Sequence, residues 1–551
     1  MKMMLKSISL LVTIYLLSGC QLIAQSLNVQ YGGPWGIQKL TYGNETLIDL
    51  SKKIGRLFTP ESYKASKKGG GEVVGWSHLQ SHTWDHNKKE YTANFIWGNV
   101  ICAYRQMTDT LYINIRITNT SQGDIFNGLS FSPLSFVYNK RPDNFQEYFP
   151  YYTNNISSPG FIRAQLDAYH VTVENPLPDK KVYVGFMEEK SNNGSLYKVW
   201  TGNHPYNGMQ DFDPAVQLKL QPGKSFEYTI AIRFSKPNAT IESVAAKSLS
   251  NFRTRQPVKI AWKDRRPIGE LYMSSYTGTK YENNARNWSV APLNEINIKT
   301  AAGQAAFRNK VLEFGRRSIV TMKDLNAQGV IVWDIEGQEY PHPYSYIGSP
   351  ELLEKLAPEM NVVADQFFNL FRRAGFKTGI CIRPDSVVFN KEGNWIEHLA
   401  VKDPVATMLR KIKYAKKRWC CSIFYVDTNV DEAGKVMDYS IFKKLAELCP
   451  DVLIIPEHER ISYYAYTAPF SDLKFENVLL EQEVKSIYPE AFKVINVPEG
   501  LKSTEAQNIA NLVASLKQGN IFLFRPWFND QPTNGLIKKA WKIFSENKER
   551  R

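Results

Sequence analysis

The sequence predicts a β-sandwich followed by a (β/α)8 TIM barrel. The chain has 551 residues, too many for one ordinary core, so two domains after an N-terminal leader are expected. Apolar and polar residues alternate from about 27 to 251, whereas short apolar runs alternate with amphipathic helices beyond about 266. Hydrophobic residues make up 43% of the chain and charged residues 22%, which is typical of folded domains.

Residues 1–26 have the order of a signal peptide. Two lysines precede an apolar stretch at 8–17 that is too short for a stable transmembrane helix. The run Leu-Ser-Gly-Cys at 17–20 resembles a lipobox, in which Cys20 becomes the lipidated first residue of the mature chain. Ordinary cleavage near 24–26 is the alternative. We therefore expect an exported protein, in the periplasm or at the cell surface, that contacts a membrane only through a lipid anchor.

The first domain is expected over 27–258. Leu111, Ile113, Ile115 and Ile117 alternate with polar residues, and the same pattern returns at 226–234. Turn signals separate such runs and no long helix is evident between them, which favours an antiparallel β-sandwich. A basic, proline-containing connector at 253–266 ends this domain.

The second domain is expected over 259–551. The apolar runs that we interpret as its strands are 268–274, 329–335, 377–383, 422–427, 451–456, 475–480, 492–497 and 520–524, the sixth being the weakest. The segments between them are long enough for crossover helices, such as 349–375 and 503–517, so a closed barrel is favoured. No Gly-rich nucleotide-binding sequence follows a strand, and we expect no cofactor.

Composition excludes several other classes of function. The formal net charge of +14 is dispersed and comes with no binding motif, so a nucleic acid partner is not predicted. The five cysteines after Cys20 are odd in number and lack CxxC spacing, which indicates neither a disulfide framework nor a zinc site. Nothing in the sequence sets the oligomeric state.

Acidic residues end five of the expected barrel strands, and the ends of parallel strands meet at one rim. Cleavage of a glycosidic bond uses one ionised carboxylate and one protonated carboxyl group. Asp427 is the candidate nucleophile, and Glu457, beside His458, is the candidate acid/base, with Glu459 as its competitor. Because neighbouring strands lie about 4.8 Å apart, the two carboxyl groups are expected at the roughly 5 to 5.5 Å separation of a retaining enzyme.

Other residues at the same rim are candidates for binding substrate. They are Trp333, Asp334, Glu336, Arg383, Asp385, His458, Glu499 and Trp527. Arg383 and Asp385 suit sugar hydroxyls or the orientation of Asp427, with a structural salt bridge as the alternative. The acidic side chains and His458 also suit a divalent metal, but the chain has 8 histidines and no HxH or HExxH pair, so no metal is expected.

The run Phe-Tyr-Val-Asp-Thr-Asn at 424–429 resembles the fourth-strand nucleophile motif of α-glycosidases in glycoside hydrolase families 31 and 36. Their sandwich-then-barrel architecture is similar too. Ile-Ile-Pro-Glu at 454–457 is similar to the fifth-strand acid/base position of the α-amylase family, although no sixth-strand Asp of the family 31 and 36 type is evident. The resemblance implies a glycosidase for an oligo- or polysaccharide, and the strand spacing favours retention. A catalytically silent carbohydrate-binding lipoprotein is the alternative.

Overall fold

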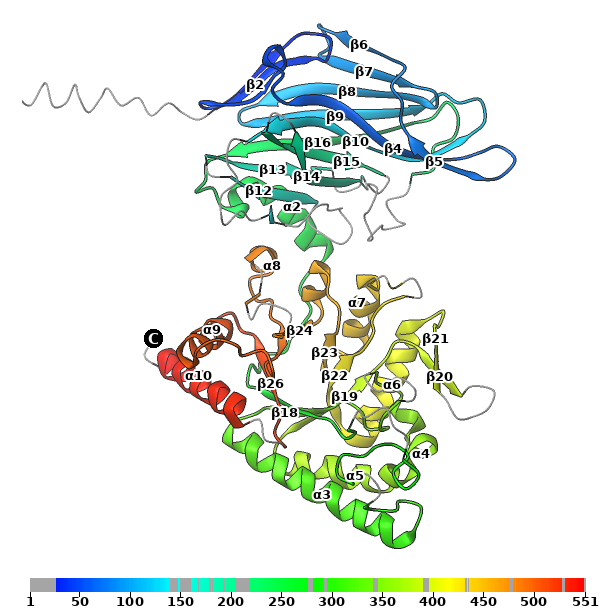
Figure 1. The fold of residues 1–551 in the computed structure, drawn as a ribbon, viewed down its shortest axis with the longest axis vertical. Helices are drawn as coiled ribbons and strands as arrows, with labels where there is room; N and C mark the ends of the chain where they lie inside the picture. The colour runs from blue at the N-terminus through cyan, green and yellow to red at the C-terminus, as the bar shows by residue number, and fades with distance from the viewer. Residues whose placement is uncertain are drawn as a thin grey trace, which may run out of the picture. The chain divides into compact units, whose positions relative to one another are not determined.

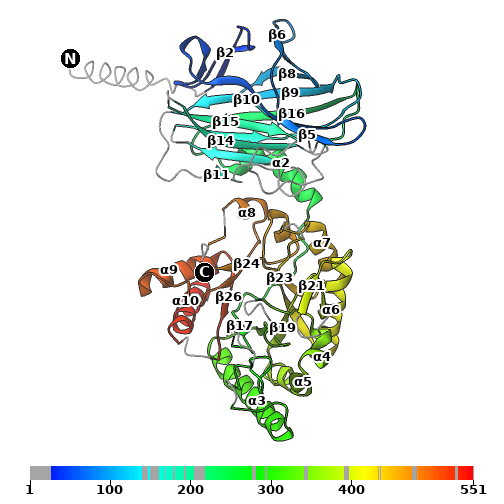
Figure 2. The same ribbon diagram turned by 45° about the vertical axis from the view of Figure 1, so that its right-hand side comes forward.

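The computed structural model describes residues 26–138, 147–148, 160–166, 168–177, 180, 182–191, 194–203, 218–275, 281–291, 295–339, 345–389, 396–431, 434, 436–474, 479–480, 482–527 and 531–549. Cys20 and the expected leader, except Ser26, lie outside the described residues. The chain forms two compact units, Met1–Thr254 and Arg255–Arg551 (Figures 1 and 2). No helix within the described ranges is long and apolar enough to cross a membrane.

The first unit is built from antiparallel sheets, which confirms the β-sandwich. Its strands are β1 (Leu27–Tyr31), β2 (Ile37–Tyr42), β3 (Glu45–Asp49), β4 (Arg56–Ser66), β5 (Glu72–Trp76), β6 (Ser81–Asp85), β7 (Glu90–Phe95), β8 (Gly98–Met107), β9 (Thr110–Asn119), β10 (Ile125–Val137), β11 (Glu147–Tyr148), β12 (Phe161–Gln165), β13 (His170–Glu174), β14 (Tyr183–Ser191), β15 (Gly194–Gly202) and β16 (Ser225–Ser235). An eight-stranded sheet of order β11-β12-β13-β16-β9-β8-β7-β6 lies beside a five-stranded sheet of order β14-β15-β10-β4-β5 and a three-stranded sheet, β1-β2-β3. In β9 the four alternating residues from Leu111 to Ile117 are buried, as expected of a half-buried strand.

The alternating strand pattern does not continue to residue 251 as expected, because the last strand, β16, ends at Ser235. Helix α2 (Ile241–Arg255) follows β16. Its buried positions, Ile241, Val244, Ala245, Ser248, Leu249 and Phe252, recur at helical spacing. This period of 3–4 residues is visible in the sequence, but the strongly alternating strands before it hide it.

The second unit contains eight parallel strands, which confirms the barrel. They are β17 (Ile268–Leu271), β18 (Gly329–Val332), β19 (Lys377–Ile382), β22 (Cys421–Val426), β23 (Leu453–Pro456), β24 (Phe470–Asp472), β25 (Val494–Asn496) and β26 (Ile521–Phe524). They pair in the order β23-β22-β19-β18-β17-β26-β25-β24, so the first strand lies beside the last. Between β23 and β24 the Ala468 amide donates to Ile454 O at 3.0 Å, which bridges the remaining gap.

The sixth strand is not at 475–480 as expected. It is β24, a strand of three residues that begins at Phe470, while residues 475–478 lie outside the described residues. So short a strand offers no apolar run that a sequence pattern can detect. The expected helix at 349–375 is also interrupted, because Pro358 begins a new helix after a break at Ala357.

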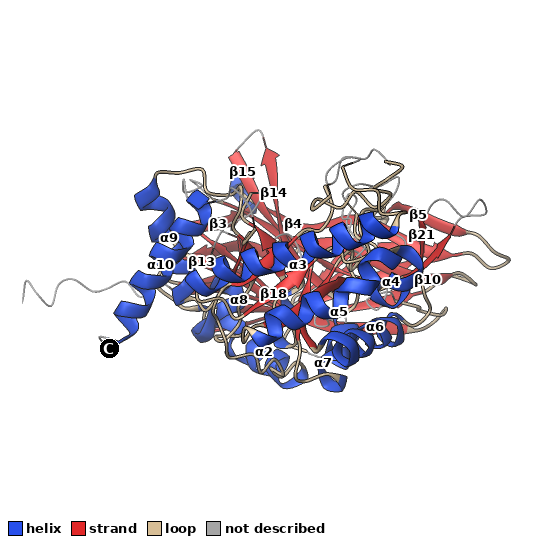
Figure 3. Cartoon of the chain, turned by 90° about the horizontal axis from the view of Figure 1, so that it is seen from below, coloured by secondary structure: helices blue, strands red, loops and turns tan. Residues whose placement is uncertain are grey.

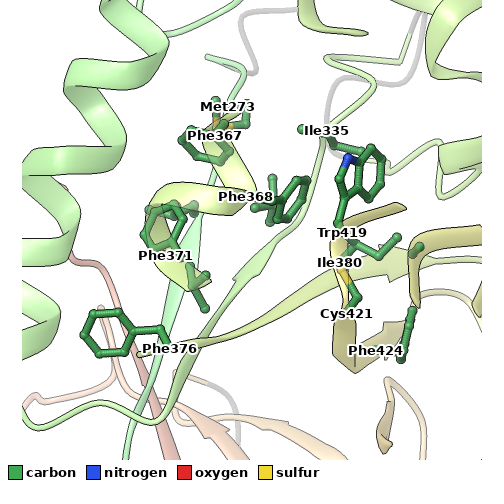
Figure 4. Packing of buried hydrophobic residues seen from close by; sticks show 14 of the residues in the cluster. Met273, Ile335, Phe367, Phe368, Phe371, Phe376, Ile380, Trp419, Cys421 and Phe424 are labelled. Atoms are coloured by element: carbon green, nitrogen blue, oxygen red, sulfur yellow. The ribbon is translucent and has the colours of Figure 1, made fainter. Parts of the chain in front are cut away.

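Helices cover the outside of the barrel. They are α3 (Ala301–Asp324), α4 (Leu353–Leu356), α5 (Pro358–Arg373), α6 (Pro404–Trp419), α7 (Tyr439–Leu448), α8 (Gln482–Ile487), α9 (Glu505–Lys517) and α10 (Gln531–Glu549), with short 3-10 turns at Pro350–Leu352 and Ile461–Ala465. Figure 3 shows α3, α5 and α6 next to one another in the second unit. Figure 4 shows part of the packing between α5 and α6, where Phe368 and Trp419 stack with ring centroids 4.6 Å apart. A hairpin of β20 (Ser386–Phe389) and β21 (Ile396–Leu399) leaves the segment after β19.

Candidate active site

Alternate residues along the barrel strands form two separate hydrophobic clusters. One cluster joins the strands to the helices and contains Phe424 and Val426 of β22. The other, which we call the inner cluster, contains residues of all eight strand segments, among them Ile423 and Tyr425. Since successive side chains in a strand point to opposite faces, the inner cluster fills the barrel interior.

Polar residues continue this inward alternation where the strands end. These residues are Glu270, Arg383, Asp427, Glu457, Asp472, Asn496 and Arg525. Asp427 follows Tyr425 of β22 by two positions, and Glu457 follows Ile455 of β23 by two. Because every second side chain in a strand points into the barrel, acidic groups from separate strands are directed toward one end of its interior.

Asp427 is the more buried of the two carboxylates Asp427 and Glu457, with 6% of its surface exposed. Its Oδ2 accepts from Thr428 Oγ1 at 3.1 Å and lies 3.5 Å from Arg383 Nε. Burial is the main cause that raises the pKa of Asp427 from 3.8 to about 7; Arg383 opposes the increase and the nearby Glu457 adds to it. Asp427 therefore changes its charge near neutral pH.

Glu457 is tied to the segment that carries Asp427. Its Oε2 accepts from the Thr428 backbone amide at 2.7 Å, and 32% of its side chain is exposed. Thr428 has a φ of 51°, a left-handed conformation that is rare for a β-branched residue. The strained turn at Thr428 thus brings the candidate nucleophile and Glu457 to one short segment of backbone. His458 Nε2 lies 3.8 Å from Glu457 Oε2.

Asn429, the last residue of the Asp-x-Asn motif, joins the loops after β22 and β23. It is fully buried, donates from Nδ2 to His458 O at 3.1 Å, and accepts from the His458 amide at 2.7 Å. These two hydrogen bonds to the His458 backbone set the spacing between the ends of β22 and β23. Asn429 therefore positions Asp427 and Glu457 through the backbone.

Glu459 has a different set of contacts. Its Oε1 lies 3.3 Å from Lys493 Nζ, and its Oε2 accepts from Tyr464 OH. Lys493 immediately precedes β25 and has the parity of Ile495, which belongs to the cluster outside the barrel. The structure brings Glu457, rather than Glu459, together with the segment that carries Asp427.

Arg383 lies among carboxylates. Its Nε is 3.3 Å from Asp385 Oδ2, and its Nη1 donates to Ser345 Oγ at 2.8 Å and to Tyr346 O at 3.2 Å. The buried Lys411 donates to the backbone oxygens of Arg383 and Asp385, at 2.9 Å in each case. Arg383 therefore lies within ion-pair distance of both Asp385 and Asp427, and its predicted roles stay predictions.

Two residues in this region, the buried Glu339 and the half-buried His398, were not identified from the sequence. Glu339 and His398 come from the loop after β18 and from β21, and His398 Nε2 lies 2.9 Å from Glu339 Oε2. A single His in a short strand and a Glu inside a loop carry no spacing signal.

Trp333 lies below the polar residues, inside the barrel. Its ring is packed by Tyr425 at 4.0 Å, Tyr346 at 5.5 Å and Tyr272 at 5.7 Å between centroids. Trp527 contacts Tyr272 at 5.6 Å and Phe314 of α3 at 6.1 Å. Trp333 therefore packs inside the barrel beneath the polar residues of the site. Trp527 packs toward the outer helices.

Asp334 and Glu336 are buried and engaged with the backbone of their own unit. Asp334 accepts from the Met273 and Ser274 amides at 2.6 and 2.8 Å, and from the Ser274 hydroxyl. Glu336 accepts from the Ser349 amide at 2.8 Å, and burial raises its pKa to about 7. These contacts hold the loops after β17 and β18.

A second group of ion pairs joins Glu270 of β17 to Arg525, which follows β26, and to Glu499, which follows β25. Arg525 Nε is 3.2 Å from Glu270 Oε1, and its Nη1 is 2.8 Å from Glu499 Oε1. Burial is the main cause that raises the pKa of Glu270 to about 7, against the opposing charge of Arg525 and with a smaller contribution from Asp472. Glu499 is half-exposed, as expected of a rim residue. Glu270 was not identified from the sequence because it lies inside the strand expected at 268–274 and not at its end.

Asp472 is a further acidic residue that the sequence analysis missed. It ends β24, has inward parity with Phe470, and accepts from Asn496 Nδ2 at 3.4 Å. It went unnoticed because the sixth strand was expected at 475–480. Within the described residues, no group of three or more His, Cys, Asp or Glu side chains is arranged to hold a metal ion.

No protein-family model matches the sequence, and no curated protein matches it. Solved structures are similar in fold at low sequence identity. The GH36 α-galactosidase from Geobacillus stearothermophilus is 10% identical with a TM-score of 0.42, over 95% of this chain and 86% of that one. The galactosidase domain of the α-galactosidase-sucrose kinase AgaSK is 10% identical with a TM-score of 0.43, over 88% and 74%.

The ligand-free α-N-acetylgalactosaminidase NagBb from Bifidobacterium bifidum is 8% identical with a TM-score of 0.41, over 83% of this chain and 91% of that one. Each of the three similarities extends over most of both chains. The chemistry of the site rests on the residues of this chain.

Proposed function

We propose that the protein is a retaining glycoside hydrolase that acts on an oligo- or polysaccharide. The observation that carries the proposal is the pairing of two carboxyl groups through one residue, since Thr428 contacts Asp427 through its hydroxyl and Glu457 through its amide. Two carboxyl groups on neighbouring parallel strands match the arrangement that retaining glycosidases use.

In the proposed reaction Asp427 is the nucleophile and Glu457 is the acid/base. Asp427 attacks the anomeric carbon, the glycosidic C–O bond breaks, and Glu457 gives its proton to the departing oxygen. Glu457 then takes a proton from water, which attacks the same carbon and releases Asp427. Arg383 supports this role because its positive charge, 3.5 Å away, favours the ionised form of Asp427.

The pKa of about 7 at Asp427 makes the assignment of roles testable. A nucleophile must be ionised, so kcat/KM should rise with pH through about 7 if Asp427 attacks. It should fall over the same range if Asp427 is instead the proton donor. A pH profile therefore distinguishes the two roles in the folded wild-type protein.

The direct test is turnover on a panel of aryl α- and β-glycosides, followed by NMR of the first-formed anomer. α-Galactosides and α-N-acetylgalactosaminides are included because the similar structures bear those names. The expected result is hydrolysis of one glycoside with net retention, abolished by Asp427→Asn. Binding of sugars without any product would contradict the proposal, and so would undiminished activity of the Asp427→Asn variant.

We also propose that the mature chain begins at an acylated Cys20 and is held at a membrane surface. The lipobox-like run at 17–20 supports this proposal. Wild-type protein should enter the detergent phase on phase separation, and Cys20→Ala protein should remain in the aqueous phase. Equal partitioning of both would contradict it.

A further inference from the structure

His398 is directed toward the barrel rim by the alternation of β21. Ile396 is buried and His398 is half-buried, whereas Glu397 and Leu399 are exposed on the opposite face of the hairpin. The hairpin therefore presents one ionisable side chain, His398, to the segment that follows β19.

Both nitrogens of the His398 ring face a carboxylate. Nε2 lies 2.9 Å from Glu339 Oε2, and Nδ1 lies 3.0 Å from Asp385 Oδ2. Only the Nε2 contact with Glu339 has hydrogen-bond geometry, while the Nδ1 contact with Asp385 is an ion-pair distance, so a protonated ring places a positive charge beside both carboxylates. The geometry thus favours the imidazolium form.

Arg383 is a second cation near these carboxylates, and Lys411 also interacts electrostatically with Asp385. Its Nη1 is 3.1 Å from His398 Nε2 and 3.9 Å from Glu339 Oε2, and its Nε contacts Asp385 and Asp427. The Nη1 group has Ser345 and the Tyr346 carbonyl as acceptors, so it does not require a lone pair on His398. With His398 neutral, Arg383 would face three carboxylates in a buried region, with Lys411 beside Asp385 as a further positive charge.

We propose that His398 is a positioning residue, whose imidazolium neutralises Glu339 and Asp385 and so leaves the charge of Arg383 available to Asp427. The proposal rests on the proposed function, because it assigns His398 a role in keeping the nucleophile ionised. Glu339, Asp385 with Arg383, and Asp427 follow β18, β19 and β22 respectively, whereas His398 lies on β21, outside the barrel strands.

The charged groups around His398 set the direction of its titration. Glu339, Asp385 and Arg383 face it, while Lys411 of α6 binds the backbone beside Asp385. Burial alone lowers the pKa of His398, but the hydrogen bonds of Asp385 and Glu339 outweigh it, so the net direction is upward from 6.5. The support for Asp427 is therefore present below the His398 pKa and is lost as pH rises through it.

The experiment follows the Asp427 carboxyl directly in the full mature chain. Protein with carboxyl-13C aspartate is titrated by NMR, and the Asp427 signal is assigned by its absence from Asp427→Asn protein. His398→Gln is compared with Glu397→Gln, the matched control that removes a charge from the opposite face of the same hairpin. The acid limb of kcat/KM is measured in both variants.

In His398→Gln the Asp427 pKa and the acid limb should both rise by about one unit, which lowers kcat/KM at low pH about tenfold. Glu397→Gln should move neither. A merely structural role would lower thermal stability and leave the Asp427 pKa in place, which would overturn the proposal.

A second measurement does not depend on the variant folding. The imidazole of His398, followed by 15N NMR in wild-type protein, should titrate above the ordinary 6.5. Titration at or below that value would overturn the proposal. If the wild type hydrolyses no glycoside, the proposed function fails, while the two NMR titrations still decide whether His398 controls the charge of Asp427.

Discussion

Removing the charge of Arg383 tests whether this side chain keeps Asp427 ionised. Its Nε lies 3.5 Å from Asp427 Oδ2, where a Coulomb energy at an effective dielectric of about 20 is about 5 kcal/mol. Arg383 also contacts Asp385, so about half of this energy, or about 2 pKa units, is assigned to Asp427. Arg383→Met should therefore raise the Asp427 pKa from about 7 to about 9.

The assay is kcat/KM against pH for Arg383→Met and for Arg383→Lys, which keeps the charge. At pH 7 the ionised fraction of Asp427 falls from about one half to about 1%, so activity should drop roughly 50-fold and recover toward pH 9. Arg383→Lys should keep its acid limb near 7. Circular dichroism confirms that each variant is folded, and an unchanged limb in folded Arg383→Met would refute the reasoning.

Four further substitutions test other contacts. Glu457→Gln should lower kcat by about 10²- to 10⁴-fold, with the smallest loss on substrates that have a good leaving group. Glu459→Gln should lower only the thermal midpoint. If Glu459→Gln instead causes the larger loss of kcat, Glu459 is the acid/base and Glu457 is not. Glu336 has a folded pKa of about 7 against an ordinary 4.5, so it makes the unfolding free energy fall by about 3 kcal/mol as pH rises between those values. Urea unfolding at pH 5 and pH 8 should show this loss reduced in Glu336→Gln, and an identical loss in both proteins would contradict it. Asn429→Ala removes two hydrogen bonds to the His458 backbone and should lower the free energy of unfolding by about 2 kcal/mol in the same assay. A decrease below about 0.5 kcal/mol would contradict the role of Asn429 in joining the two loops.

Long strands and their parity were predictable from the sequence. The apolar run before Asp427 is β22, and alternation alone places this carboxylate on the inner face. The same reasoning failed at β24, because a strand of three residues is too short to show a period, and Asp472 was missed with it.

Contacts that depend on tertiary packing were not predictable. Glu457 and Glu459 are two residues apart, yet Glu459 pairs with Lys493, which lies 34 positions further along the chain. The partners of His398 come from two other loops, and no local pattern brings them together. Strand ends can therefore be assigned from periodicity, while the ion pairs that set their charge require the fold.

The central claim is tested most directly by trapping the covalent intermediate. A 5-fluoro glycosyl fluoride of the hydrolysed sugar is incubated with the protein, and the digested adduct is sequenced by mass spectrometry. A glycosyl ester on Asp427 is the predicted result. An ester on Glu457 or Asp472, or hydrolysis with inversion and no adduct, would contradict the assignment.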